Sequence, residues 1–158
     1  MRGQGLTKMY KELPKRRFAR QAAHLNMISN YPNSAVKLPS TVASLELTFK
    51  TNIENGHAGI KNFWKYNLKT IQFHNPQLPI SVRRIKTADE EESRKCPSVL
   101  KINMLDGGSQ TIDCKSKRSE AILQEFLELT KAESIPEDEI PVVLTPSEKI
   151  VQQEKEFS

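Results

Sequence analysis

Apolar and polar residues alternate strictly along residues 45–50, where Leu45, Leu47 and Phe49 are separated by a glutamate and a threonine. A period of two is typical of a strand that buries one face. We therefore expect a strand here that ends near Asn52.

The apolar spacing becomes helical after a turn at Asn55 and Gly56. One stripe is formed by Ile60, Phe63, Trp64, Leu68 and Ile71. This spacing predicts an amphipathic helix, and Pro76 should end it because the residue before a proline disfavours helical backbone. Both aromatic residues fall on the stripe, so we expect them in the core.

Three further strands and a second helix follow. We expect a strand at residues 80–85, followed by an acidic, mobile loop at residues 88–93. Residues 99–105 and 110–113 should then form a hairpin, whose turn is made by Asp106, Gly107 and Gly108. The last helix takes its buried face from Ile122, Leu123, Phe126, Leu127 and Leu129. Ser116 or Ser119 can cap this helix.

This order of elements predicts an α/β fold within residues 41–132. Because a helix connects the first two strands, they should lie parallel with a right-handed crossover, and the hairpin should extend the sheet antiparallel. The result is a four-stranded mixed sheet with two helices, the thioredoxin-like arrangement. Residues 1–40 would form a basic arm and linker. Residues 133–158 would form an acidic tail, in which a capping-box sequence at Thr145 favours a short helix.

The net charge of +5 conceals a strong separation of positive and negative charge along the chain. Residues 1–20 carry +6 and residues 21–119 another +6, whereas residues 120–158 carry −7. A basic arm on a basic body favours a polyanionic partner, and an acidic tail can solvate the protein or meet a basic neighbour. No apolar run approaches the roughly 20 residues that cross a bilayer, so we expect a soluble chain without a membrane partner.

Several classes of chemistry are disfavoured. Cys96 and Cys114 stand 18 residues apart and the three histidines are scattered, so neither a disulfide nor a metal site is expected. Residues 56–61 lack the spacing and the hydroxyl of a nucleotide-binding loop. Residues 55–58 contain no cysteine where a thioredoxin-like fold would place its reactive one. We therefore expect no enzyme activity, cofactor or small-molecule substrate.

Basic residues on several elements favour contact with the phosphates of a nucleic acid. Lys61, Lys65 and Lys69 recur every four residues and share one face of the first helix. Such a row is often only a solvated face, but it is accompanied here by Arg94, Lys95, Lys115, Lys117 and Arg118. The predicted RNA-binding residues are Lys15, Arg16, Arg17, Arg20, His57, Lys61, Lys65, Lys69, Arg83 and Arg84. No aromatic ladder on a strand indicates base-specific stacking.

The N-terminal arm has a second interpretation. Residues 1–28 are rich in arginine and lysine, contain Glu12 as their sole acid, and place Phe18, Ala22 and Leu25 at helical spacing. Mitochondrial import recognises segments of this kind, whereas a basic arm kept on the mature protein would bind nucleic acid. One segment can do both, and import would place the protein in the mitochondrial matrix.

Residues 55–86 resemble a known family. The residues that carry the resemblance are Gly56, Gly59, Phe63, Trp64, His74, Asn75, Pro76, Pro79, Ile80 and Val82. This pattern is similar to the small thioredoxin-like domain shared by certain mitochondrial ribosomal proteins and an accessory subunit of respiratory complex I. The likeness is strongest to fungal members from the large ribosomal subunit, and it spans roughly residues 45–129.

The resemblance implies a noncatalytic structural protein of the mitochondrial large ribosomal subunit. Its partners would be mitochondrial ribosomal RNA and neighbouring mitochondrial ribosomal proteins. An accessory subunit of complex I, or a protein of the small mitochondrial ribosomal subunit with the same domain, is the alternative. A thiol oxidoreductase is a third hypothesis, and the missing dithiol argues against it.

Overall fold

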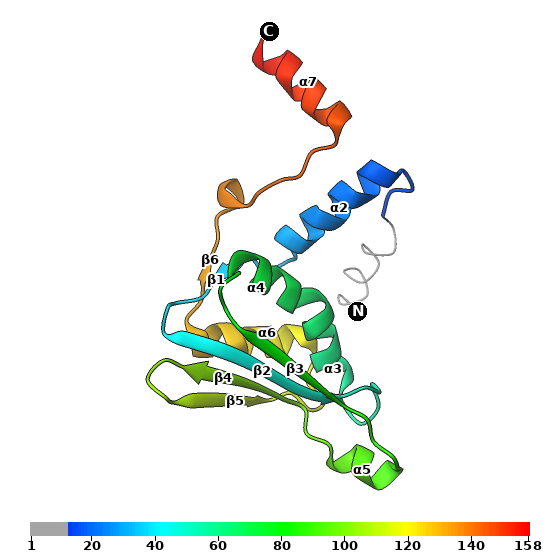
Figure 1. The fold of residues 1–158 in the computed structure, drawn as a ribbon, viewed down its shortest axis with the longest axis vertical. Coiled ribbons are helices and arrows are strands. Elements are labelled where there is room, and N and C mark those ends of the chain that lie inside the picture. The colour runs from blue at the N-terminus through cyan, green and yellow to red at the C-terminus, as the bar shows by residue number, and fades with distance from the viewer. Residues whose placement is uncertain (1–12) are drawn as a thin grey trace.

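A four-stranded mixed sheet forms the centre of the computed structural model, which describes residues 13–158 (Figure 1). Its strand order is β3-β2-β4-β5. The strands are β2 (Val42–Lys50), β3 (Ile80–Ile85), β4 (Val99–Met104) and β5 (Ser109–Asp113). β2 and β3 are parallel, whereas β4 pairs antiparallel with both β2 and β5. The predicted thioredoxin-like sheet is confirmed.

The two predicted helices are present and contact each other. The first consists of α3 (Ala58–Asn62), a π-helical segment η1 (Phe63–Asn67) and α4 (Leu68–His74). The second is α6 (Ser119–Thr130), which touches α3 and η1. The ring of Phe63 packs edge-on against that of Phe126, with their centroids 6.1 Å apart. Phe63 thus joins the two helices in one layer.

The core lies between this helical layer and one face of the sheet. Leu45, Leu47 and Phe49 are buried as their alternation predicts, together with Leu100, Ile102 and Ile112 of the hairpin. Phe63 is fully buried, which confirms its predicted place, but Trp64 is only partly buried and packs at the margin of the core. The opposite face of the sheet is polar, and Lys101 and Glu46 pair there at 3.7 Å.

Two glycines seat the first helix against the loop that leads into α6. Gly56 has a φ of +83°, which favours glycine, and its carbonyl oxygen accepts the Ser116 N–H at 2.9 Å. A Cβ on Gly59 would lie only 1.7 Å from the carbonyl oxygen of Lys117. Ser116 is therefore part of this contact and does not cap α6, whose N-cap, Arg118, makes no side-chain cap hydrogen bond.

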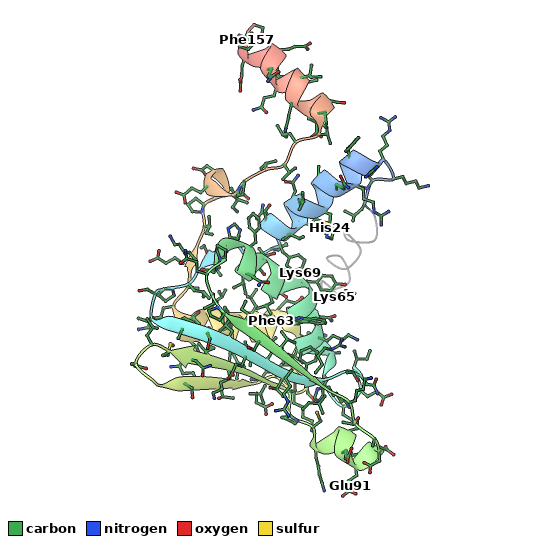
Figure 2. The ribbon with its side chains drawn as sticks, viewed as in Figure 1. His24, Phe63, Lys65, Lys69, Glu91 and Phe157 are labelled. Atoms are coloured by element: carbon green, nitrogen blue, oxygen red, sulfur yellow. The ribbon has the colours of Figure 1, made fainter. Side chains whose placement is uncertain are left out.

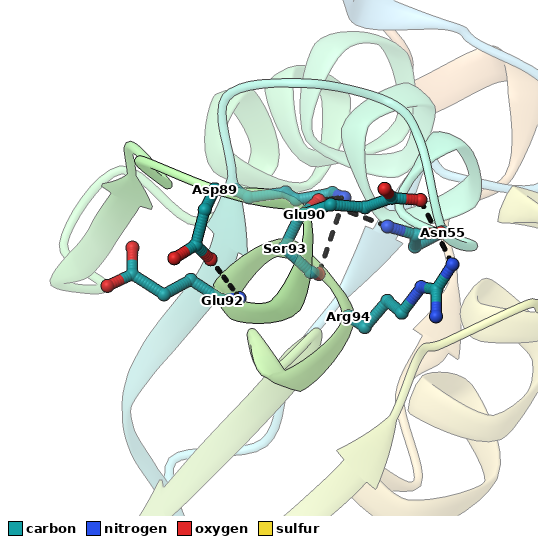
Figure 3. A network of polar contacts seen from close by, with 7 residues as sticks. Asn55, Asp89, Glu90, Glu92, Ser93 and Arg94 are labelled. Atoms are coloured by element: carbon teal, nitrogen blue, oxygen red, sulfur yellow. Dashed lines mark hydrogen bonds and ion pairs between the residues drawn. The ribbon is translucent and has the colours of Figure 1, made fainter.

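The prediction of an acidic mobile loop is wrong, because the segment contains the helix α5 (Glu90–Lys95). Asp89 caps the helix by accepting the Glu92 N–H at 2.7 Å. Ser93 is buried and its hydroxyl accepts hydrogen bonds from Asn55 Nδ2, at 3.0 Å, and from Lys50 Nζ (Figure 3). A short helix, capped by Asp89 and held to the domain by Ser93, therefore takes the place of the predicted loop.

The segment expected to be a linker, residues 30–40, packs against the domain. Tyr31 is buried and stacks on Tyr66 with ring centroids 5.9 Å apart, and the hydroxyl of Ser34 accepts a hydrogen bond from Asn67 Nδ2 at 2.8 Å. β1 (Val36–Lys37) pairs antiparallel with β6 (Glu133–Ser134). The two ends of the domain therefore meet at one small sheet.

Helices extend from the domain at both ends. α2 (Arg17–Ser29) occupies the part of the N-terminal arm in which apolar residues recur at helical spacing, and it contacts α4. The 3₁₀ turn η2 (Glu137–Glu139) leads to α7 (Pro146–Glu156), which starts with the predicted capping box. Asn26 holds the two extensions together through two hydrogen bonds with the backbone of Val143, at 2.7 and 2.9 Å. Beyond this joint α7 projects away from the sheet (Figure 1).

Candidate nucleic-acid interface

Three lysines form a row along the first helix. Lys61, Lys65 and Lys69 lie on α3, η1 and α4 in turn, and Lys65 and Lys69 are exposed (Figure 2). In an uninterrupted α-helix, residues four apart are offset by about 40° around the axis, so a row of three would spiral. A π segment has more residues per turn and counteracts this offset. The π turn therefore favours a straight row.

A groove of about 550 Å³ lies between this helix and the edge strand β3. Its cationic groups are Arg84 and the three lysines. Its other lining residues are Trp64, Leu68, Gln72, Ile80 and Val82. The groove thus combines a cationic rim with a largely apolar floor.

Arg84 is held in place above aromatic rings. Its Cζ atom lies 5.0 Å from the ring centroid of Trp64 and 5.7 Å from that of Phe49, and its Nη2 donates to the carbonyl oxygen of Thr51 at 3.3 Å. The side chain is nevertheless exposed. Arg83 is also exposed, but strand alternation turns it to the opposite face of the sheet from the groove. The two neighbouring arginines therefore do not act at one site.

Several other basic residues have partners of their own. Arg94 pairs with Glu90 and Lys95 with Glu91, both at 2.9 Å, and Lys117 pairs with Glu125 at 2.6 Å. In the described part of the chain, the three lysines of the row make no salt bridge. The row is therefore less neutralised than the basic residues around α5 and α6.

His57 is wrongly predicted as an RNA contact. It is fully buried, and its Nδ1 accepts the backbone N–H of Lys50 at 3.2 Å. Burial lowers its pKa, and the positive charge of Lys50 lowers it further. His57 is therefore a neutral core residue near physiological pH, and it cannot reach a phosphate from this position.

The basic residues of the arm lie at the beginning of α2. Lys15, Arg16, Arg17 and Arg20 are all exposed. Because α2 contacts α4, the arm and the lysine row belong to neighbouring elements. The structure thus places nine of the ten predicted residues at the surface, with Lys61 half-buried, and it brings the row and Arg84 together in one groove.

Together these features define a thioredoxin-like domain whose β2–α3 junction carries no cysteine and whose helix edge is basic. Residues 60–119 match the model of the mitochondrial ribosomal protein L51 / S25 / CI-B8 domain. The chain is 36% identical over 137 residues to large ribosomal subunit protein mL61 of Saccharomyces cerevisiae, covering 84% of this chain and 97% of that relative. The chain therefore belongs to the mL61 family of large ribosomal subunit proteins.

A second relative supports this assignment. The protein of the same name from Neurospora crassa is 28% identical over 123 residues, which cover 64% of this chain and 61% of that relative. The resemblance to fungal large-subunit proteins is thereby confirmed, and it favours the ribosome over the complex I alternative. Within residues 13–158, no helix is both long and apolar enough to cross a membrane.

Proposed function

We propose that the protein is a structural constituent of the mitochondrial large ribosomal subunit, located in the matrix, that binds ribosomal RNA and neighbouring ribosomal proteins. Membership of the mL61 family supports this role. The observation that carries the RNA contact is the lysine row, whose members have no acidic partner among the described residues. A family of ribosomal proteins gives no reason to expect catalysis.

The RNA contacts are to phosphates. Lysines on one helix face neutralise phosphate charge and release counterions, which gives affinity and register without reading sequence. The exposed basic residues of the arm add to this contact from the neighbouring helix α2. Binding should therefore weaken steeply as the salt concentration rises.

The tail is better suited to a protein partner. Residues 133–158 carry an excess of acidic residues, which would be repelled by RNA. Ile150, Val151 and Phe157 are nevertheless exposed on or beside α7, Phe157 by 91%. An amphipathic helix of this kind fits an apolar groove rimmed by basic residues on a neighbouring protein.

We propose that the chain divides into a basic arm (1–40), a thioredoxin-like domain (41–132) and an acidic tail (133–158).

Cosedimentation tests the ribosomal role. The tagged chain should comigrate with mitochondrial large subunits in a sucrose gradient at low salt. Recovery with inner-membrane respiratory complexes instead would refute the proposal and revive the complex I alternative.

Salt titration tests the RNA contact. Lys65→Gln with Lys69→Gln should reduce the slope of log affinity against log salt by about 0.7 for each lost phosphate contact. Lys95→Gln with Lys101→Gln removes the same charge from two lysines that already have acidic partners. This control should leave the slope unchanged, and equal effects of the two pairs would contradict the assignment.

A further inference from the structure

We propose that the groove between the first helix and β3 holds an unpaired nucleotide of a single RNA strand. Its base would stack on Arg84, and the backbone on either side would follow the lysine row. The inference rests on the proposed ribosomal function and specifies which kind of RNA this surface takes. The sequence showed no aromatic ladder on a strand, and the stacking surface proposed here is instead an arginine on a tryptophan.

Arg84 supplies the stacking surface. The guanidinium lies over the ring of Trp64, and its hydrogen bond to Thr51 limits its rotation. Because Arg84 remains exposed above Trp64, a base can lie on its outer side. Unstacked bases of RNA characteristically lie on aromatic rings or on arginine planes. The pair therefore offers a prearranged platform.

The floor of the groove argues against a duplex. Val82 is 37% exposed although it lies in a strand, and it lines the groove together with Ile80, which is half-buried. A duplex presents phosphates and sugars to a protein and would leave these side chains against water, whereas the flat face of a base covers them. Gln72 lines the same groove and provides an amide that can hydrogen-bond a base edge.

The lysine row supplies the path of the backbone. Four helical residues rise by about 6 Å, which is comparable to the separation of neighbouring phosphates in an extended strand. The π segment favours keeping Lys61, Lys65 and Lys69 in line along the groove. Grooves that bind single strands combine such a cationic track with stacking surfaces. An acidic peptide could use the lysines, but it would leave the Arg84–Trp64 platform unused.

The chain contains one tryptophan, so its fluorescence reports directly on the groove. Titration of the full chain with a ten-nucleotide oligoadenylate should quench Trp64 emission, whereas a hairpin duplex at equal phosphate concentration should quench it much less. Polyglutamate is the third probe. Quenching by polyglutamate equal to that by oligoadenylate would overturn the proposal in favour of an acidic peptide.

Two variants test the platform itself. Arg84→Lys keeps the charge and removes the plane, so affinity for oligoadenylate should fall about tenfold with an unchanged salt slope. Arg83→Lys is the matched control on the opposite face of the sheet; it keeps the positive charge that a phosphate contact of Arg83 would use, so this variant should bind as the parent does. Val82→Ser, at an exposed position, should also weaken binding while the urea midpoint confirms that the chain is folded.

The outcomes separate this inference from the broader function. If Arg84→Lys, Arg83→Lys and the parent bind and quench alike, stacking is refuted, although cosedimentation with large subunits would still support the ribosomal role. If the chain does not cosediment with large subunits, the ribosomal role fails, whatever happens in the groove.

Discussion

Replacement of Gly59 by alanine tests the packing of the first helix against the loop before α6. A methyl group at this position would lie 1.7 Å from the carbonyl oxygen of Lys117 and 2.8 Å from its carbonyl carbon. Both are backbone atoms, so no side chain can rotate away. To reach even 3.0 Å, the helix and the loop must separate by at least 1.3 Å.

The expected cost combines two opposing effects. Alanine favours helix over glycine by about 1 kcal/mol, whereas forcing extra atoms into a packed site costs about 1–3 kcal/mol or more. The separation would also strain the contact of Phe63 with Phe126, because α3 and η1 both touch α6. Because only backbone atoms meet the methyl group, the upper end of the packing cost applies, and the helix gain of about 1 kcal/mol is subtracted from it. We therefore expect Gly59→Ala to lower the free energy of unfolding by about 2 kcal/mol, which is a large share of a typical 5–15 kcal/mol.

Urea denaturation followed by circular dichroism measures this loss. The control is Gly107→Ala in the hairpin turn, where φ is +90° and an added Cβ would meet nothing within 4 Å. Gly107→Ala should lower the free energy of unfolding only by the strain of an alanine at positive φ, about 1 kcal/mol. A loss for Gly59→Ala no greater than that for Gly107→Ala would refute the close approach of helix and loop.

Three further predictions concern buried and tethering groups. Lys50→Met removes a fully buried cation, so the free energy of unfolding should stay the same or rise; a loss above about 2 kcal/mol would contradict this reasoning. The pKa of His57 is lowered from 6.5, so stability should decline as pH falls below 6.5, where the unfolded chain takes up a proton that the folded chain resists. His57→Gln should flatten that decline, and an unchanged pH profile would exclude His57 as its source. Asn26→Ala removes both hydrogen bonds to Val143, so limited proteolysis should cut the tail faster while the urea midpoint of the domain stays constant.

Local pattern was sufficient to predict the sheet and both main helices. The alternation of apolar and polar residues identified β2, and the helix between two strands indicated their parallel pairing. Contacts distant in sequence were not visible in the same way. Asn67 is buried because its amide meets Ser34, 33 residues earlier, and this contact holds residues 30–40 on the domain. No local sequence pattern indicates that Asn67 and Ser34 will meet.

The candidate site was partly predictable. Lysine spacing indicated the row, and strand alternation alone is enough to separate Arg83 from Arg84 onto opposite faces of the sheet. His57 is buried and its Nδ1 accepts the backbone N–H of Lys50. Nothing in the sequence indicated this burial, because a histidine between a glycine and an alanine is not part of an apolar pattern. The helix α5 was missed although its sequence contained an N-cap aspartate and two glutamates four residues before basic partners.

The pairing of β1 with β6 has a mechanical consequence. Val36 faces Ser134 in an antiparallel pair, so the backbone leading to α2 and the backbone leading to α7 leave from the same end. Tension that draws these two helices apart would open the pair from that end, as a zipper opens. On the N-terminal side, the contacts of Tyr31 with Tyr66 and of Ser34 with Asn67 would also take up load before the central sheet does. The protein can thus yield at its attachments while its folded body remains intact.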